Sequence, residues 1–193
     1  IARASSSCRQ GPVDLGPPLK IVDTYKTPLK RDPFAVSTEE KVGLLLRASQ
    51  EMQRVKGVAV AEASAEVQRE SKAFASSEGS FIEQVIVETG CGIEATAVGE
   101  GEVQRRSYPN SVGRHQGTEG WEFVERQDLP GNAQRVAEEA VALLTAKPCP
   151  SGITTVVLDG SQVALQVHES CGHAVELDRV FGMEAGFAGT SFL

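Results

Sequence analysis

Apolar and polar residues follow two different periods along the chain. Over residues 38–56, apolar side chains recur every three or four positions, as in a helix with one buried face. Ser37 precedes this stripe and Glu40 follows three positions later, which forms a capping box at the helix start. A second helical stripe follows Asn132, which we expect to cap a helix that ends before Pro148.

A period of two dominates the middle of the chain and predicts strands. The alternation divides this region into strands within residues 57–71, 72–90, 92–110 and 120–129. The second and third of these ranges each hold two strands, joined by turns near Gly79 and near Gly99 to Gly101. Connections this short favour an antiparallel β-meander.

Two more elements are predicted after the second helix. Residues 152–159, "GITTVVLD", form a continuous apolar run, which is typical of a buried strand. Ser161 is then placed to cap a helix that runs through His173. The predicted fold class is therefore α+β, an antiparallel β-meander packed with helices, with the last helix near the C-terminus.

Composition narrows the range of functions. The chain has 193 residues, which suffices for one good core, and a net charge of −7 without any cluster of Lys or Arg. Direct nucleic-acid binding therefore lacks its electrostatic basis. No apolar run approaches the ~18 residues of a membrane span. The four cysteines are widely spaced, and we expect reduced thiols in a cytoplasmic protein.

The ends of the chain suggest how it is organised. Residues 1–36 are rich in Pro and Gly, and we expect an extended segment that belongs to a truncated N-terminal region. Residues 37–193 are expected to form one α+β domain. Because the chain starts at Ile1 and stops on an apolar run at Leu193, we expect it to be part of a longer protein.

The segment "HESCGH" carries the candidate chemistry. His168 and His173 are five positions apart, and Glu169 follows the first. A regular helix turns about 100° per residue, so the two rings would lie about 140° out of line. We expect either a π-type turn or an early helix end between them, with Gly172 permitting the distortion. Neutral imidazoles bind zinc, and an adjacent carboxylate can act as a base.

The residues alone leave several alternatives open. One histidine could be a core residue and the other a surface residue. Any third ligand would come from nearby candidates, namely Cys171, Glu176, Asp178 and Glu184. Cys171 also lies on an apolar stripe with Val163, Val167 and Val175, which we expect to be packed at the edge of the core. Glu176 can orient the ring of His173 or pair with Arg179.

The segment "VHESCGHAVELDRVFGMEAGFAGTSFL" resembles the signature of the TldD/PmbA metalloprotease family, also described as modulators of DNA gyrase. That signature is His-Glu-x-x-x-His followed by Glu-x-Asp, matched here by His168, Glu169, His173, Glu176 and Asp178. The resemblance implies a zinc-dependent peptidase of the cytoplasm that hydrolyses peptides or unfolded proteins. It makes the two histidines zinc ligands, Glu169 the general base, and Glu176 and Asp178 supporting residues or further ligands.

The resemblance also implies a third zinc ligand from another domain and a partner subunit. The third zinc ligand would be a cysteine in a C-terminal domain beyond Leu193, so we expect the isolated chain to be inactive. The protein would form a homodimer, or a heterodimer with a related subunit, without contacting nucleic acid or a membrane. The alternatives are a non-catalytic assembly or peptide-binding module, and a regulator of a DNA enzyme. We further expect the meander to offer an open edge to an extended peptide.

Overall fold

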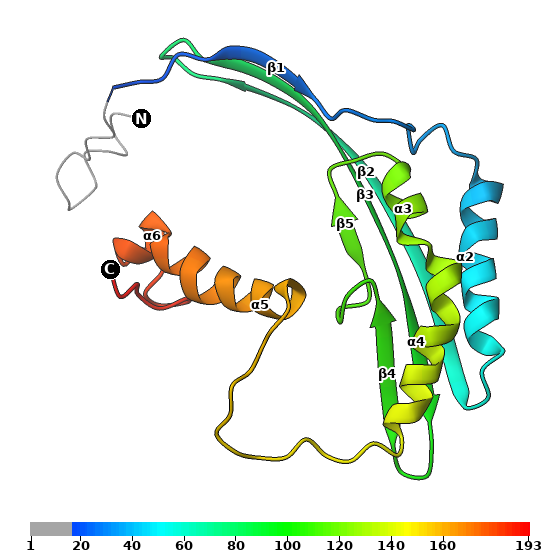
Figure 1. The fold of residues 1–193 in the computed structure, drawn as a ribbon. Helices are drawn as coiled ribbons and strands as arrows, with labels where there is room; N and C mark the ends of the chain where they lie inside the picture. The colour runs from blue at the N-terminus through cyan, green and yellow to red at the C-terminus, as the bar shows by residue number, and fades with distance from the viewer. Residues whose placement is uncertain (1–16) are drawn as a thin grey trace.

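The computed structural model describes residues 17–193, whose centre is a strongly curved five-stranded sheet (Figure 1). The strands are β1 (Val22–Lys26), β2 (Val58–Ala75), β3 (Phe81–Val98), β4 (Val103–Tyr108) and β5 (His115–Gly117). β3 is the central strand, and it pairs antiparallel with β2, β4 and β5 and parallel with β1. The fold class predicted from the sequence, α+β with a mostly antiparallel sheet, is confirmed.

Helices cover one face of this sheet. They are α2 (Thr38–Gln53), α3 (Glu122–Gln127) and α4 (Leu129–Leu143). The core lies between α2, α4 and the strands, where alternate residues of β3 are buried against both helices. Many of these residues are alanines, which lets the helices approach the sheet closely. The buried core residues include Ala48, Met52, Ile93, Ala95, Ala97, Val136 and Ala140.

Ser37 caps α2 as the sequence predicts, but the Glu40 carboxylate accepts from the guanidinium of Arg31 and does not complete the capping box. The Ser37 hydroxyl accepts a hydrogen bond from the backbone N–H of Glu40 at 3.1 Å, which satisfies one of the free N–H groups of the first turn. The helix ends at Gln53, before the predicted residue 56. This helix is therefore confirmed, with a shorter C-terminal end.

The hairpin strands are longer than the sequence pattern predicted. β2 and β3 have 18 residues each and continue through the expected breaks after residue 71 and near Gly92. The turns at Gly79 and Gly101 are confirmed, and both glycines adopt positive φ. Gly92 has another purpose, because a Cβ there would lie 1.8 Å from the carbonyl oxygen of Gly113. It lets the connection between β4 and β5 cross directly against β3.

Residues 120–129 form helical structure, so the strand predicted there is wrong. The turn of α3 buries Trp121, Phe123 and Val124 on one side, which a strand would divide between two faces. The Glu122 carboxylate accepts hydrogen bonds from the backbone N–H groups of Lys30 and Arg31 at 3.1 and 3.0 Å. Burial alone would raise the pKa of Glu122, but these and further backbone N–H donors lower it.

The predicted cap of α4 is also wrong. The helix begins at Leu129, and its cap is Asp128, whose carboxylate accepts from the N–H of Gly131 at 3.2 Å. Asn132 lies inside the first turn, where its side-chain amide donates to the carbonyl of Asp128. Aspartate and asparagine are both good capping residues, so composition could not distinguish them.

The apolar run at residues 152–159 is not a buried strand, which corrects the prediction. Ile153, Val156, Val157 and Leu158 are all exposed. No strand within residues 17–193 pairs with this run, although the outer edge of β2 has no partner strand there. The run instead forms the long connection that leads away from α4 (Figure 1).

The open sheet edge expected from the sequence is confirmed within the described residues. β2 pairs with β3 alone, so the backbone groups of its other edge have no partner strand between residues 17 and 193. The division into residues 1–36 and 37–193 stays a prediction, since residues 1–16 lie outside the described part. β1 shows that the first range contains a strand. Between residues 17 and 193, no helix has the length and apolar character that a membrane span requires.

Candidate metal centre

The motif helix consists of four consecutive helical pieces. They are α5 (Gly160–Gln166), a π-helical turn η1 (Val167–Gly172), a 3₁₀ turn η2 (His173–Val175) and α6 (Leu177–Val180). The cap is Asp159, not Ser161 as predicted, because its carboxylate accepts from the N–H of Gln162 at 2.9 Å. This bond and the hydroxyl of Ser161 lower the pKa of Asp159.

The π turn brings the two histidines together. The N–H of His173 bonds back to the carbonyl of His168, five residues earlier, so the extra residue of the spacing is absorbed in one wide turn. The ring centroids lie 4.5 Å apart and the ring planes meet at 87°. Of the two alternatives predicted from the spacing, a π-type turn or an early helix end, the π turn is the one that forms.

Gly172 is not the cause of this distortion, contrary to expectation. Its φ of −62° is in the ordinary right-handed region. A Cβ at this position would meet nothing closer than the carbonyl oxygen of Val167, at 3.7 Å. An L-residue therefore fits the π turn without strain.

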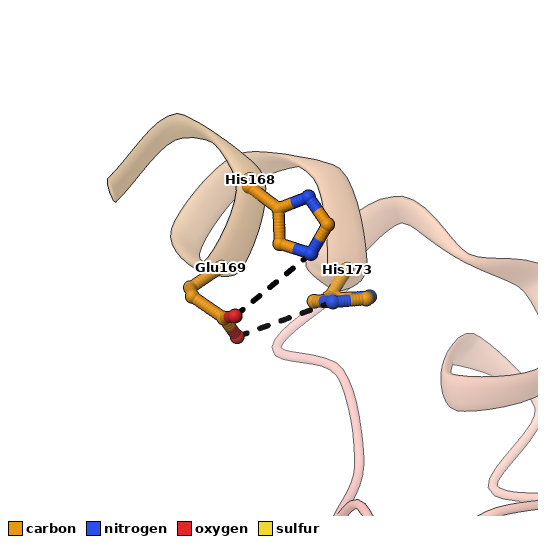
Figure 2. A group of neighbouring side chains, drawn as sticks. All are labelled: His168, Glu169 and His173. Atoms are coloured by element: carbon orange, nitrogen blue, oxygen red, sulfur yellow. Dashed lines mark ion pairs between the residues drawn. The ribbon is translucent and has the colours of Figure 1, made fainter. Parts of the chain in front are cut away.

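Glu169 lies beside the two rings, and its carboxylate faces both of them, as Figure 2 shows. One carboxylate oxygen is 3.8 Å from Nε2 of His168, and the other is 4.0 Å from Nε2 of His173. One ligand atom from each of the three residues lies within 4.8 Å of the others. Both Nε2 atoms therefore face the same small volume beside the carboxylate.

Glu176 sets the orientation of one ring. Its Oε1 is 3.0 Å from Nδ1 of His173, and because a carboxylate only accepts, Nδ1 carries the proton. The lone pair of His173 is then on Nε2, the nitrogen that faces Glu169. Glu176 also lies 3.9 Å from Nε of Arg179, so the two roles considered for it coexist. Asp178 is not part of the cluster, and its carboxylate accepts from the N–H of Arg179.

The cluster is open to solvent. The side chains of His168 and Glu169 are 63% and 58% exposed, and that of His173 is 27% exposed. The apolar stripe expected to be packed beside them is also exposed, including Val167 and Val175. Cys171 is exposed as well, so its predicted packing role is wrong. The motif helix lies on the concave side of the sheet, away from α2 and α4 (Figure 1), and Val167 and Val175 stay exposed among the elements of residues 17–193.

The donor set fits a divalent transition metal. Two neutral imidazole nitrogens and a nearby carboxylate are ligand types that zinc accepts, and catalytic zinc sites combine three protein ligands with one open position. The two histidines supply two such ligands on one side of a turn. Glu169 is close enough to act either on the metal or on a water beside it.

A second feature adjoins the cluster and was missed from the sequence. His115, to which the sequence assigned no role, lines a cavity of about 700 Å³ together with His168. The two residues come from β5 and the π turn, which are far apart along the chain. Spacing within one motif carries no signal of such a long-range contact.

An α+β domain is thus followed by a His-Glu-x-x-x-His turn in which both imidazole rings face one carboxylate. Residues 31–146 match the family described as the PmbA/TldA metallopeptidase central domain. The chain belongs to this family, which confirms the resemblance seen in the sequence.

Relatives of this chain are described as metalloproteases. One from Methanothermobacter thermautotrophicus is 34% identical over 171 residues, which cover 89% of this chain and 36% of the relative. One from Methanocaldococcus jannaschii is 31% identical, with 86% of this chain and 35% of the relative covered. One from Archaeoglobus fulgidus is 33% identical, with 81% and 34% covered. The chain thus spans about a third of the length of these relatives.

A solved structure shares the fold. A Thermotoga maritima protein, described as a modulator of a DNA gyrase, aligns with a TM-score of 0.51 at 19% identity. The alignment covers 65% of this chain and 27% of that chain. At this identity the likeness concerns the fold alone.

Proposed function

We propose that the full-length protein carrying this chain is a zinc-dependent peptidase that hydrolyses peptides or unfolded proteins in the cytoplasm. The observation that carries the proposal is the convergence of His168 and His173 on one side of Glu169 through the π turn. The family of metallopeptidases to which the chain belongs supports the same reaction class.

Each residue of the candidate site would have its own role in the reaction. His168 and His173 would hold the zinc ion through Nε2, and Glu176 would keep the ring of His173 in place. When bound, zinc polarises a carbonyl group and lowers the pKa of water. Glu169 takes the proton from the water that attacks the peptide carbonyl carbon. It then delivers this proton to the amine as the C–N bond breaks.

We infer that other parts of the full-length protein complete the site. Two histidines supply two of the three protein ligands of a catalytic zinc site, and the family resemblance implies that the third is a cysteine in a C-terminal domain. We further propose that the protein works as a dimer, with itself or with a related subunit. A net charge of −7 disfavours direct contact with nucleic acid.

The open edge of β2 supports a peptide substrate. An extended peptide can add to a sheet edge through backbone hydrogen bonds, which every sequence provides. The same edge is on the sheet whose concave side faces the motif helix (Figure 1). Substrates without a fixed fold are the ones that can adopt this extended conformation.

The test replaces Glu169 in the full-length protein. Glu169→Gln should retain zinc, measured by mass spectrometry, and lose about 10²–10⁴-fold in peptide cleavage, because only the proton acceptor is removed. His168→Ala and His173→Ala should lose zinc and cleavage together. Glu78→Gln, which alters an exposed carboxylate of the β2–β3 turn, is the control and should change neither. Full activity of zinc-loaded Glu169→Gln would refute the mechanism and favour a non-catalytic module.

A further inference from the structure

The cavity beside the candidate metal centre has two walls from distant parts of the chain. One wall comes from the β4–β5 connection and the start of β5, and the other comes from residues 160–168 of the motif helix. Its volume of about 700 Å³ lies within the roughly 300–1,000 Å³ typical of ligand pockets. The residues that line it are Pro109, Asn110, Val112, His115, Gly160, Ser161, Ala164, Leu165 and His168.

The lining is mostly apolar and carries no carboxylate, lysine or arginine. Val112 on one wall is 80% exposed, and Leu165 on the other is 67% exposed. No side chain within residues 17–193 fills the space between these walls. An apolar group that entered would remove both side chains from water, at roughly 25 cal/mol per Å² of buried apolar surface. A charged group would lose hydration there without gaining an ionic partner.

His168 connects the cavity to the candidate metal centre. Its ring lines the cavity and also lies in the His168–Glu169–His173 cluster. Ala164 and Leu165 precede it by four and three positions, so they share its side of the helix. A peptide with its carbonyl at the cluster would therefore have a neighbouring side chain within reach of this cavity.

We infer that the cavity is a specificity subsite for an apolar side chain of one of the two residues that flank the cleaved bond. The inference rests on the proposed function. On the wall formed by the β4–β5 connection, Val112 determines which side chain fits, and it lies outside the motif that would hold the metal. The protein then prefers leucine, methionine or phenylalanine beside the cleaved bond and discriminates against aspartate and lysine.

The experiment uses the full-length, zinc-loaded protein and a peptide mixture, with cleavage positions read by mass spectrometry. Val112→Asp places a carboxylate in the cavity and should lower kcat/KM for peptides with leucine or phenylalanine at the preferred position by about tenfold or more. Val103→Asp is the matched control, because Val103 is also an exposed valine, at 59%, but lies outside the cavity. It should leave kcat/KM unchanged. Val112→Phe narrows the space and should shift the preference toward alanine.

A binding measurement separates recognition from catalysis. Fluorescence anisotropy of a labelled leucine peptide on zinc-loaded Glu169→Gln should show affinity loss by a similar factor when Val112→Asp is added. If the wild-type protein cleaves peptides but neither Val112 variant alters the preference or the affinity, the subsite is wrong while the proposed function stands. If the zinc-loaded wild-type protein cleaves no peptide, the proposed function fails and the subsite fails with it.

Discussion

At the scale of single residues, the metal centre depends on which nitrogen each histidine presents. The hydrogen bond from Nδ1 of His173 to Glu176 fixes one tautomer, and the π turn supplies the direction in which Nε2 faces. A regular helix with the same sequence would turn the two rings apart. Within a continuous helix, histidines five positions apart can therefore face the same point only through a π turn, so the candidate site requires that turn.

Gly172→Ala tests whether glycine is needed for that turn. Because Gly172 has helical φ and space for a Cβ, the substitution should leave zinc affinity unchanged, measured by titration against a chromogenic chelator. It should raise the free energy of unfolding by about 0.4–1 kcal/mol, since alanine restricts the unfolded chain.

Gly92→Ala should have the opposite effect on stability from Gly172→Ala, when both free energies of unfolding are measured by urea denaturation of the 193-residue chain. A Cβ at residue 92 would lie 1.8 Å from a backbone oxygen of the β4–β5 connection, so this variant should be clearly destabilised. Loss of zinc binding in Gly172→Ala would show that glycine has a role that its backbone conformation does not explain.

At the scale of elements, several local signals predicted the structure correctly, although the caps expected at Asn132 and Ser161 were wrong, and long-range contacts carried no signal. The Ser37 cap of α2, the two hairpin turns and the π turn each depend on a few neighbouring residues, and each was predicted from the sequence, the π turn as one of two alternatives. Residues 120–129 were mistaken for a strand because Trp121, Phe123 and Val124 fit both periods over so short a length. The run at 152–159 was mistaken for a buried strand because apolar composition does not reveal whether a partner strand exists.

The candidate site divides in the same way. His168, Glu169 and His173 lie within one turn, so their spacing could predict that they converge. The wall contributed by the β4–β5 connection could not be predicted, because it depends on how Gly92 lets that connection cross β3. Exposure of Cys171 was also missed, since an apolar stripe indicates a buried face only where another element covers it.

Glu122 anchors the segment after β1 to the start of α3, and its titration should be visible in stability. Its pKa is lowered in the folded protein, so its contribution is present above the ordinary glutamate pKa of about 4.3 and is lost as the pH falls through the folded value. Glu122→Gln should therefore cost about 1–3 kcal/mol in urea unfolding at pH 7, and the difference from wild type should shrink below pH 4.

Glu100→Gln is the control for this pH dependence, because Glu100 is exposed in the β3–β4 turn. Its stability should follow that of the wild-type chain at every pH. A constant difference between Glu122→Gln and wild type from pH 7 to pH 3 would show that the carboxylate charge is not what stabilises the anchor.

At the scale of the whole molecule, the two faces of the curved sheet contact different parts of the chain. Its convex side is packed with α2 and α4 and holds the core, whereas its concave side faces the motif helix (Figure 1). Val167 and Val175 of the motif helix are exposed, and so are the apolar residues between Ile153 and Leu158 that precede it. Exposed apolar surface of this extent is characteristic of an interface with another domain or subunit. The candidate metal centre lies beside that surface, where a further ligand could be contributed.

Zinc binding by this chain alone should be weak. The 193-residue chain should bind zinc more weakly than the full-length protein by at least about 10–100-fold, the loss that even removing an outer partner of a ligand causes. It should cleave no peptide, because His168 and His173 supply only two of the three protein ligands that catalysis needs. Competition with a chelator of known affinity measures the difference, and His168→Ala in the isolated chain should abolish the remaining binding. Equal affinity in the two proteins would place the third ligand within this chain, and Glu169→Ala and Cys171→Ala would then identify it.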